Sequence, residues 1–193
     1  IAPMQSVLPT YTRFGMSALL PHKELVMSDD FKILVDGKVC DDLKSREQIL
    51  QGYEPNSKAV QFDDIKTVKD AKELTLGQDV VYIYHNQIDA RGDKLNTENE
   101  VFAACEEAVE EIHAMIKRLT SANNIHFIIT ADHGFIYKRD KLSESDKISG
   151  LPQKNALIGR RYVAAETAVN ADGIGSVTLG NVLKNADERI VSF

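Results

Sequence analysis

The residues best suited to chemistry follow an apolar run in the second half of the chain. Residues 125–130 read Ile-His-Phe-Ile-Ile-Thr, and Asp132, His133 and Gly134 come just after them. A carboxylate and an imidazole at the carboxyl end of a buried strand lie where α/β sheets bind ligands, and they can hold a divalent metal such as zinc or manganese. Asp-His-Gly is equally a good turn, because Asp closes an Asx-turn and Gly accepts a positive φ. Both interpretations stay open on these residues alone.

A second set of polar residues follows another apolar run. Residues 79–84 are mostly β-branched and aromatic, which predicts a strand buried on both faces. His85, Asp89 and Asp93 come soon after its end. If the two strands are neighbours, these groups meet Asp132 and His133 at one sheet edge, where the acids would repel one another unless a cation lies among them. The alternative is two polar loops whose acids face water.

The residues between these runs predict a βαβ unit over about residues 79–130. Thr97 and Glu100 have capping-box spacing, and apolar residues then recur at helical spacing as far as Leu119. A strand, a helix and a second strand imply parallel pairing with a right-handed crossover. The predicted fold class is therefore α/β, with mostly parallel buried strands flanked by helices. The remainder, about residues 138–193, predicts an irregular or antiparallel tail.

A hydroxyl near the start of the chain is a candidate nucleophile. Residues 12–20 predict a short helix that Pro21 stops, with Thr12 at its first turn. A hydroxyl there lies beside unpaired backbone amides, which suits a phosphoryl group, and a metal that lowers its pKa would activate it. Thr is also a common N-cap with no chemistry. Arg13 could pair with a phosphate oxygen or simply be solvated.

Composition limits the classes of function. The chain has 193 residues, 43% of them hydrophobic, and a net charge of −6, which argues against a surface for nucleic-acid backbones. Two cysteines without metal spacing indicate a reducing compartment, hence the cytoplasm, and no apolar stretch is long enough for a membrane span. Both ends look cut from a longer sequence, so we expect residues 1–193 to be a fragment of one domain.

Three short motifs together resemble a known superfamily. In chain order they are Pro9-Thr10-Tyr11-Thr12, Asp89-Ala90-Arg91-Gly92-Asp93 and Asp132-His133-Gly134. They are similar to the Pro-Thr-X-Thr, Asp-X-X-Gly-His and Asp-His-Gly motifs of the phosphodiesterase and pyrophosphatase branch of the alkaline phosphatase superfamily. With their surrounding residues, from Leu8 to about Val163, they resemble more narrowly the PglZ domain of bacterial phage-growth-limitation and bacteriophage-exclusion systems.

The resemblance implies roles for individual residues and two divalent metal ions, zinc or manganese. Thr12 would be the nucleophile and a ligand of one metal, which Asp132 and His133 would also bind, and Asp89 would bind the other. Asp93 stands where better-studied enzymes have His, so it is either a harder ligand that favours manganese or magnesium, or no ligand. His85 and Arg13 are candidate substrate-binding residues.

The resemblance also implies a function and its alternatives. We expect an alkaline-phosphatase-like core, and a metal-dependent phosphatase or phosphodiesterase domain of an anti-phage defence protein whose partners are other defence-system proteins. The Asp93 departure keeps open a non-catalytic scaffold of the same system. A phosphate-transferring mutase of the superfamily is a third option.

Two departures from the superfamily pattern generate a prediction. A strand with a metal-bridging Asp should precede Thr12, and a late His should follow the tail strands, but only seven residues precede Leu8 and no His follows His133. We therefore expect this chain to bind zinc or manganese weakly or not at all and to have little activity. Calorimetric titration with either metal checks this expectation, and a tight site would contradict it.

Overall fold

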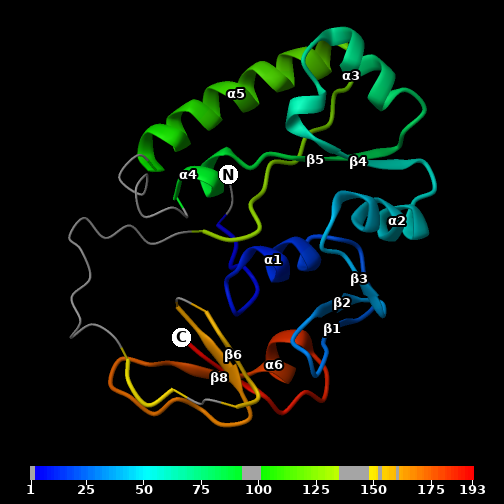
Figure 1. Cartoon of the computed structure of the whole chain (residues 1–193). Coiled ribbons are helices and arrows are strands. Elements are labelled where there is room, and N and C mark those ends of the chain that lie inside the picture. The colour runs from blue at the N-terminus through cyan, green and yellow to red at the C-terminus, as the bar shows by residue number, and fades with distance from the viewer. Residues whose placement is uncertain (1–2, 93–100, 135–147, 152–153, 160) are drawn as a thin grey trace. The chain divides into compact units, whose positions relative to one another are not determined.

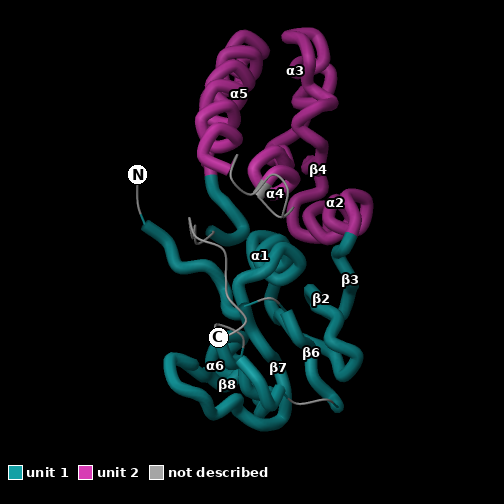
Figure 2. Tube along the Cα trace, turned by 60° about the vertical axis from the view of Figure 1, so that its left-hand side comes forward, with its two compact units in different colours: residues 1–41, 130–193 teal, residues 42–129 magenta. Residues whose placement is uncertain are grey.

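The computed structural model describes residues 3–92, 101–134, 148–151, 154–159 and 161–193 (Figure 1). The chain divides into two compact units, shown in different colours in Figure 2: residues 1–41 with 130–193, and residues 42–129. The prediction of one domain over residues 1–193 stays a prediction. No helix in the described ranges is both long and apolar enough to cross a membrane.

The first unit begins with a short helix and a small antiparallel sheet. Their bounds are α1 (Thr12–Ala18), β1 (Leu25–Met27), β2 (Ile33–Val35) and β3 (Lys38–Val39), with strand order β1-β2-β3. Asp36 and Gly37, with φ of 49° and 76°, form the tight turn between β2 and β3 that Asp-Gly predicts. Helix α1 packs on β2, and Phe14 and Val35 are both fully buried there.

The tail of the chain completes the first unit with a four-stranded antiparallel sheet. Its elements are β6 (Ala156–Ile158), β7 (Val163–Ala165), β8 (Ser176–Thr178), α6 (Leu179–Leu183) and β9 (Ile190–Ser192), in strand order β6-β7-β9-β8. This pairing agrees with the antiparallel tail that the sequence predicts. Val191 of β9 and Leu179 of α6 are fully buried in this part of the unit.

Arg189 fastens this tail to the beginning of the chain. Its guanidinium donates hydrogen bonds to the carbonyl oxygens of Met27 and Ser28 and to the carboxylate of Asp187. Asn185 also donates to the carbonyl oxygen of Leu25, at 3.3 Å. Because backbone carbonyls at the end of β1 are satisfied by a side chain from the tail, residues far apart in sequence form one unit.

The second unit is built on a parallel strand pair. Its elements are α2 (Leu43–Tyr53), β4 (Ser57–Gln61), the 3₁₀ helix η1 (Phe62–Asp64), α3 (Val68–Thr75), β5 (Val80–Tyr84), α4 (Gln87–Gly92) and α5 (Val101–Ser121). Strands β4 and β5 pair in parallel, from Ser57 opposite Val80 to Gln61 opposite Tyr84, and α3 makes the crossover between them. The parallel component of the α/β prediction is therefore present, but it lies earlier in the chain than predicted.

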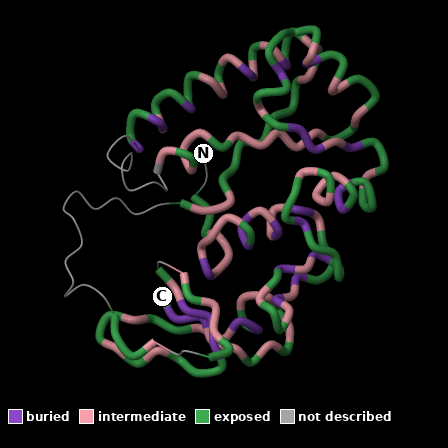
Figure 3. The backbone as a smooth tube through the Cα atoms, in the orientation of Figure 1, coloured by how far each residue is buried: buried purple, intermediate pink, exposed green. Residues whose placement is uncertain are grey.

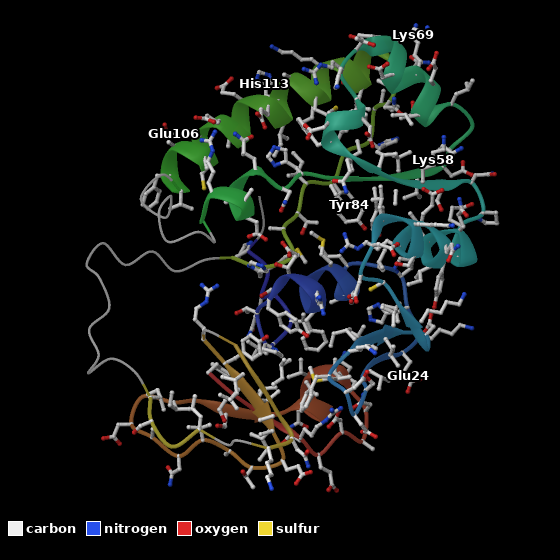
Figure 4. All side chains as sticks on the ribbon, in the orientation of Figure 1. Glu24, Lys58, Lys69, Tyr84, Glu106 and His113 are labelled. Atoms are coloured by element: carbon white, nitrogen blue, oxygen red, sulfur yellow. The ribbon has the colours of Figure 1, made fainter. Side chains whose placement is uncertain are left out.

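Helices cover both faces of this strand pair. Helices α3 and α5 lie on one face (Figure 1), where Val60, Ile65 and Met115 are among the residues of one buried cluster. Helix α2 packs on the other face, where Arg46 lies 5.0 Å from the ring centroid of Tyr84 (labelled in Figure 4). The strand pair is therefore held between helices, as parallel strands require.

Helix α2 begins earlier than its sequence pattern indicates. The sequence suggests a start at Ser45 with Gln48 completing a capping box, but the N-cap is Asp42. The Asp42 side chain accepts a hydrogen bond from the Ser45 amide at 2.7 Å, and the Ser45 hydroxyl lies 3.3 Å from the Asp42 amide. The prediction was displaced by three residues because Ser45 can serve equally as the far partner of a capping box.

The predicted second strand of the βαβ unit over residues 79–130 is wrong. Residues 125–130 belong to no strand, and they run exposed after α5 (Figure 3), with Ile128 95% and Ile129 64% exposed. The expectation that β5 is buried on both faces is also wrong, because Val80 is 38% exposed. An apolar run becomes a strand only where a neighbour completes its hydrogen bonds, and within the described residues β5 pairs with β4 alone.

The Asp187–Arg189 pair predicts a pH-dependent contribution to stability. The two side chains are 11% and 17% exposed, and hydrogen bonding from Arg189 lowers the pKa of the Asp187 carboxyl. A carboxyl whose folded pKa lies below its unfolded pKa, about 3.9, stabilises the fold above that value, and the contribution is lost as the pH falls through the folded pKa. Asp187→Asn should lower the free energy of unfolding by about 2 kcal/mol at neutral pH.

Urea unfolding at neutral and acidic pH measures this contribution. The difference between wild type and Asp187→Asn should shrink below about pH 4. Asp172→Asn, at an exposed position in the same unit, is the matched control and should change stability by less than about 0.5 kcal/mol. A wild-type advantage that persists unchanged in acid would show that the charge pair is not its source.

Candidate active site

Thr12 is the first residue of α1 and not its cap. The N-cap is Tyr11, which has extended backbone angles (φ −145°, ψ 155°) and makes no side-chain capping bond. The Tyr11 carbonyl accepts from the amides of Phe14 and Gly15, which starts the helix. The interpretation of Thr12 as an ordinary N-cap is therefore wrong, and its hydroxyl makes another contact.

That contact is with His133. Thr12 Oγ1 lies 3.2 Å from His133 Nε2, and His133 Nδ1 lies 2.9 Å from the Gly134 carbonyl oxygen. A carbonyl oxygen only accepts hydrogen bonds, so in the neutral imidazole Nδ1 carries the proton and Nε2 accepts from the Thr12 hydroxyl. The contact therefore joins two residues that lie 121 positions apart in sequence, through the hydroxyl oxygen of one and a ring nitrogen of the other, which are the atoms of these side chains that can react.

Asp132 supplies a buried carboxylate beside the same imidazole. Its Oδ2 is buried and has no hydrogen-bond partner among the described residues, and it lies 3.6 Å from His133 Nε2. A buried carboxylate oxygen without a hydrogen bond is costly and marks a place where a cation fits. A carboxylate oxygen and an imidazole nitrogen this close can coordinate one divalent ion, so the donor set fits zinc or manganese.

Aromatic residues around Thr12 are a feature that sequence reasoning missed. The rings of Tyr11 and Tyr162 stack with centroids 5.2 Å apart, and Phe14 lies 6.0 Å from Tyr11. Burial, and then the nearby Tyr162, raise the pKa of the Tyr11 phenol, so it stays neutral at physiological pH. No local pattern in the sequence announces the stack, because Tyr162 comes from the distant tail.

Arg13, a predicted substrate-binding residue, is exposed at the start of α1. Its guanidinium Nε lies 3.9 Å from the Asp41 carboxylate, and the side chains are 68% and 46% exposed. A pair at that distance and exposure contributes little to stability. Nothing in this placement prevents Arg13 from meeting an anionic substrate.

The second unit holds the other predicted site residues. Asp89 lies in the first turn of α4. His85 follows β5, where its Nε2 lies 2.7 Å from Glu111 Oε2 of α5 and its ring meets Phe62 edge-on at 4.6 Å. These contacts hold His85 against α5 and η1. Its role in binding substrate stays a prediction. Asp93, like the Thr97–Glu100 capping box, lies outside the described residues.

An ion pair and a hydrogen bond connect α4, which carries Asp89, with α5. Arg91 Nη2 lies 2.6 Å from Glu107 Oε2, to which Gln87 also donates at 2.9 Å. The hydrogen bond from Arg91 lowers the pKa of Glu107, which keeps that carboxylate charged. On the same helix, Glu106 and His113 are exposed (labelled in Figure 4).

Comparison with known proteins identifies the family to which this chain belongs. The family model described as "BREX system PglZ alkaline phosphatase-like domain" matches residues 1–184. The chain therefore belongs to the PglZ family of alkaline phosphatase-like domains, as the three motifs predict.

Two curated relatives are similar in sequence to the whole chain or to most of it. The chain is 35% identical over 196 residues to "Alkaline phosphatase-like protein PglZ" of Bacillus cereus (strain H3081.97). This alignment covers 99% of the chain and 23% of the relative. It is 37% identical over 148 residues to "Alkaline phosphatase-like protein BrxZ" of Escherichia coli O9:H4 (strain HS), covering 73% of this chain and 17% of the relative. The chain thus spans less than a quarter of either relative. No solved structure matches it.

The buried oxygen of Asp132 predicts an effect on stability that is independent of activity. Asp132→Asn keeps the shape of the side chain and removes its charge, so without metal the free energy of unfolding should rise by about 1 kcal/mol. Urea unfolding with a chelator present measures this change, with Asp172→Asn as the control at an exposed acid. A clear loss of stability in Asp132→Asn would contradict the interpretation that the buried Asp132 carboxylate lowers stability and is retained because it binds a ligand.

Proposed function

We propose that this domain hydrolyses phosphate esters in a metal-dependent reaction in which Thr12 is the nucleophile. The observation that carries the proposal is the 3.2 Å approach of Thr12 Oγ1 to His133 Nε2, beside the buried Oδ2 of Asp132. A hydroxyl, an imidazole and a carboxylate brought together from distant parts of the sequence are a nucleophile with its activating groups. Membership in an alkaline phosphatase-like family supports the same reaction class.

Each residue has a proposed task. Asp132 and His133 would hold one divalent ion, zinc or manganese, and Asp89 a second by the family resemblance. A bound ion would supply Lewis acidity and lower the pKa of a nearby hydroxyl. Thr12 Oγ1 loses its proton to solvent and forms a bond to phosphorus as the bond from phosphorus to the leaving oxygen breaks, and the leaving oxygen takes up a proton. Water then attacks phosphorus, so the phosphoryl group leaves Thr12 and the hydroxyl regains its proton. Arg13 and His85 are the proposed contacts for the charged oxygens of the substrate.

The biological setting is proposed from the family. Its description assigns this domain to the BREX system, and the resemblance points to phage defence. We infer that the partners of the intact protein are other proteins of that system. A cytoplasmic location is part of the same proposal, because neither cysteine forms a disulfide.

Replacing the nucleophile tests the proposal in the full-length polypeptide that carries this domain. With a chromogenic phosphodiester or monoester and manganese or zinc, Thr12→Ala should reduce kcat by at least about a hundredfold, because the variant lacks the oxygen that attacks phosphorus. Thr12→Ser, which keeps the hydroxyl, should retain part of the activity. Thr10→Ala, which removes a hydroxyl two residues earlier, is the matched control.

The outcomes separate the two candidate functions. Activity that survives Thr12→Ala would reject Thr12 as the nucleophile. A wild-type protein that is inactive with both metals and both ester classes would favour the non-catalytic scaffold, for which Asp93 in place of His is the specific observation.

A further inference from the structure

Helix α1 approaches the Asp132 backbone more closely than any side chain would allow. Gly15 is buried in α1, one turn after Thr12 and on the same side of the helix. A Cβ placed on Gly15 would lie 2.3 Å from the Asp132 carbonyl oxygen, 2.7 Å from its carbonyl carbon and 2.9 Å from its Cβ. Real Cβ atoms essentially never come within 3.0 Å of such atoms, and here two of the three are backbone atoms that no rotamer change can move.

This approach lies next to the candidate chemistry. Asp132 directly precedes His133, so the residue that touches Gly15 is bonded to the one that Thr12 contacts. The Thr12 Oγ1 to His133 Nε2 distance of 3.2 Å is already at the long end for a hydrogen bond. Moving α1 outward by about the ångström that a Cβ needs would therefore break this bond.

We propose that Gly15 is a positioning residue that sets the distance between the Thr12 hydroxyl and the Asp132-His133 pair. Glycine inside a helix lowers helix stability relative to alanine, so its presence needs a reason, and the close approach to Asp132 supplies one. This proposal rests on the proposed function only in its claim that the distance serves the reaction. The distance itself can be tested without metal or substrate.

The chain offers a matched control for the substitution. Gly52 is also helical, in α2, but it is exposed and a Cβ there meets nothing within 4 Å. Gly52→Ala therefore makes the same chemical change in a helix without the steric conflict. It should leave the first unit unchanged.

The readout is the tautomer of the neutral His133 imidazole in the 193-residue chain, measured by nitrogen NMR of the ring at mildly alkaline pH with a chelator present. In wild type the proton should reside on Nδ1, because Nε2 accepts from Thr12. Gly15→Ala should shift the ratio of the tautomers about fivefold toward Nε2–H, the factor that one hydrogen bond is worth. Gly52→Ala should leave the ratio unchanged.

A double variant shows whether Gly15 acts through Thr12. Thr12→Val removes the hydroxyl and keeps the shape, so it should shift the ratio as Gly15→Ala does. The double variant Thr12→Val/Gly15→Ala should shift it no further, because both changes remove the same bond. An unchanged ratio in folded Gly15→Ala, or a double variant whose shift is the sum of the two, would overturn the proposal.

A wild-type measurement covers the case in which Gly15→Ala does not fold. The geometry requires a nuclear Overhauser effect between a Gly15 α-proton and the Asp132 β-protons. Its presence supports the proposal and its absence overturns it. A protein that shows these signals but lacks hydrolase activity would reject the proposed function alone, so the two failures can be told apart.

Discussion

The contact between the Thr12 hydroxyl and the His133 imidazole is the interaction that gives the first unit its chemical meaning. It joins residues from the two chain segments that form that unit, and it depends on residues that take no part in the chemistry themselves. Tyr11 starts α1 so that Thr12 is helical, and Gly15 lets the helix reach the Asp132 backbone. Arg189 fastens the tail of the chain to β1, which stabilises the same unit. The nucleophile candidate is therefore positioned by close backbone packing together with these hydrogen bonds.

The buried oxygen of Asp132 shows how the unit balances stability against function. A carboxylate that is buried without a hydrogen bond among the described residues lowers stability, and folded proteins keep such groups mainly where a ligand compensates for the loss. His133 is arranged consistently with this interpretation. Its Nε2, the nitrogen that would coordinate an ion, lies 3.2 Å from the Thr12 hydroxyl, so the ligand and the candidate nucleophile lie side by side.

The sequence predicted local features and the antiparallel tail, but it did not identify the partners of the apolar runs. The Asp36-Gly37 turn, the strand at β5 and the long helix α5 follow from turn chemistry and periodicity, which act over a few residues. Residues 125–130 have the composition of a buried strand but lie exposed, because strand formation depends on a partner that composition does not identify. The parallel pair of β4 and β5 was missed for the same reason. Among site residues, the motifs singled out Thr12, Asp132 and His133, but Gly15 gains its meaning only from a backbone 117 residues away in sequence.

In the proposed reaction, Thr12 carries the phosphoryl group between its departure from the substrate and its hydrolysis. The most direct measurement is mass spectrometry of the full-length polypeptide, quenched in acid during turnover of a phosphate ester with manganese or zinc. We expect a peptide containing residues 9–13 with phosphate on Thr12, and no such peptide when the substrate is omitted. Turnover with Thr12 unmodified, or with phosphate on another residue, would contradict it.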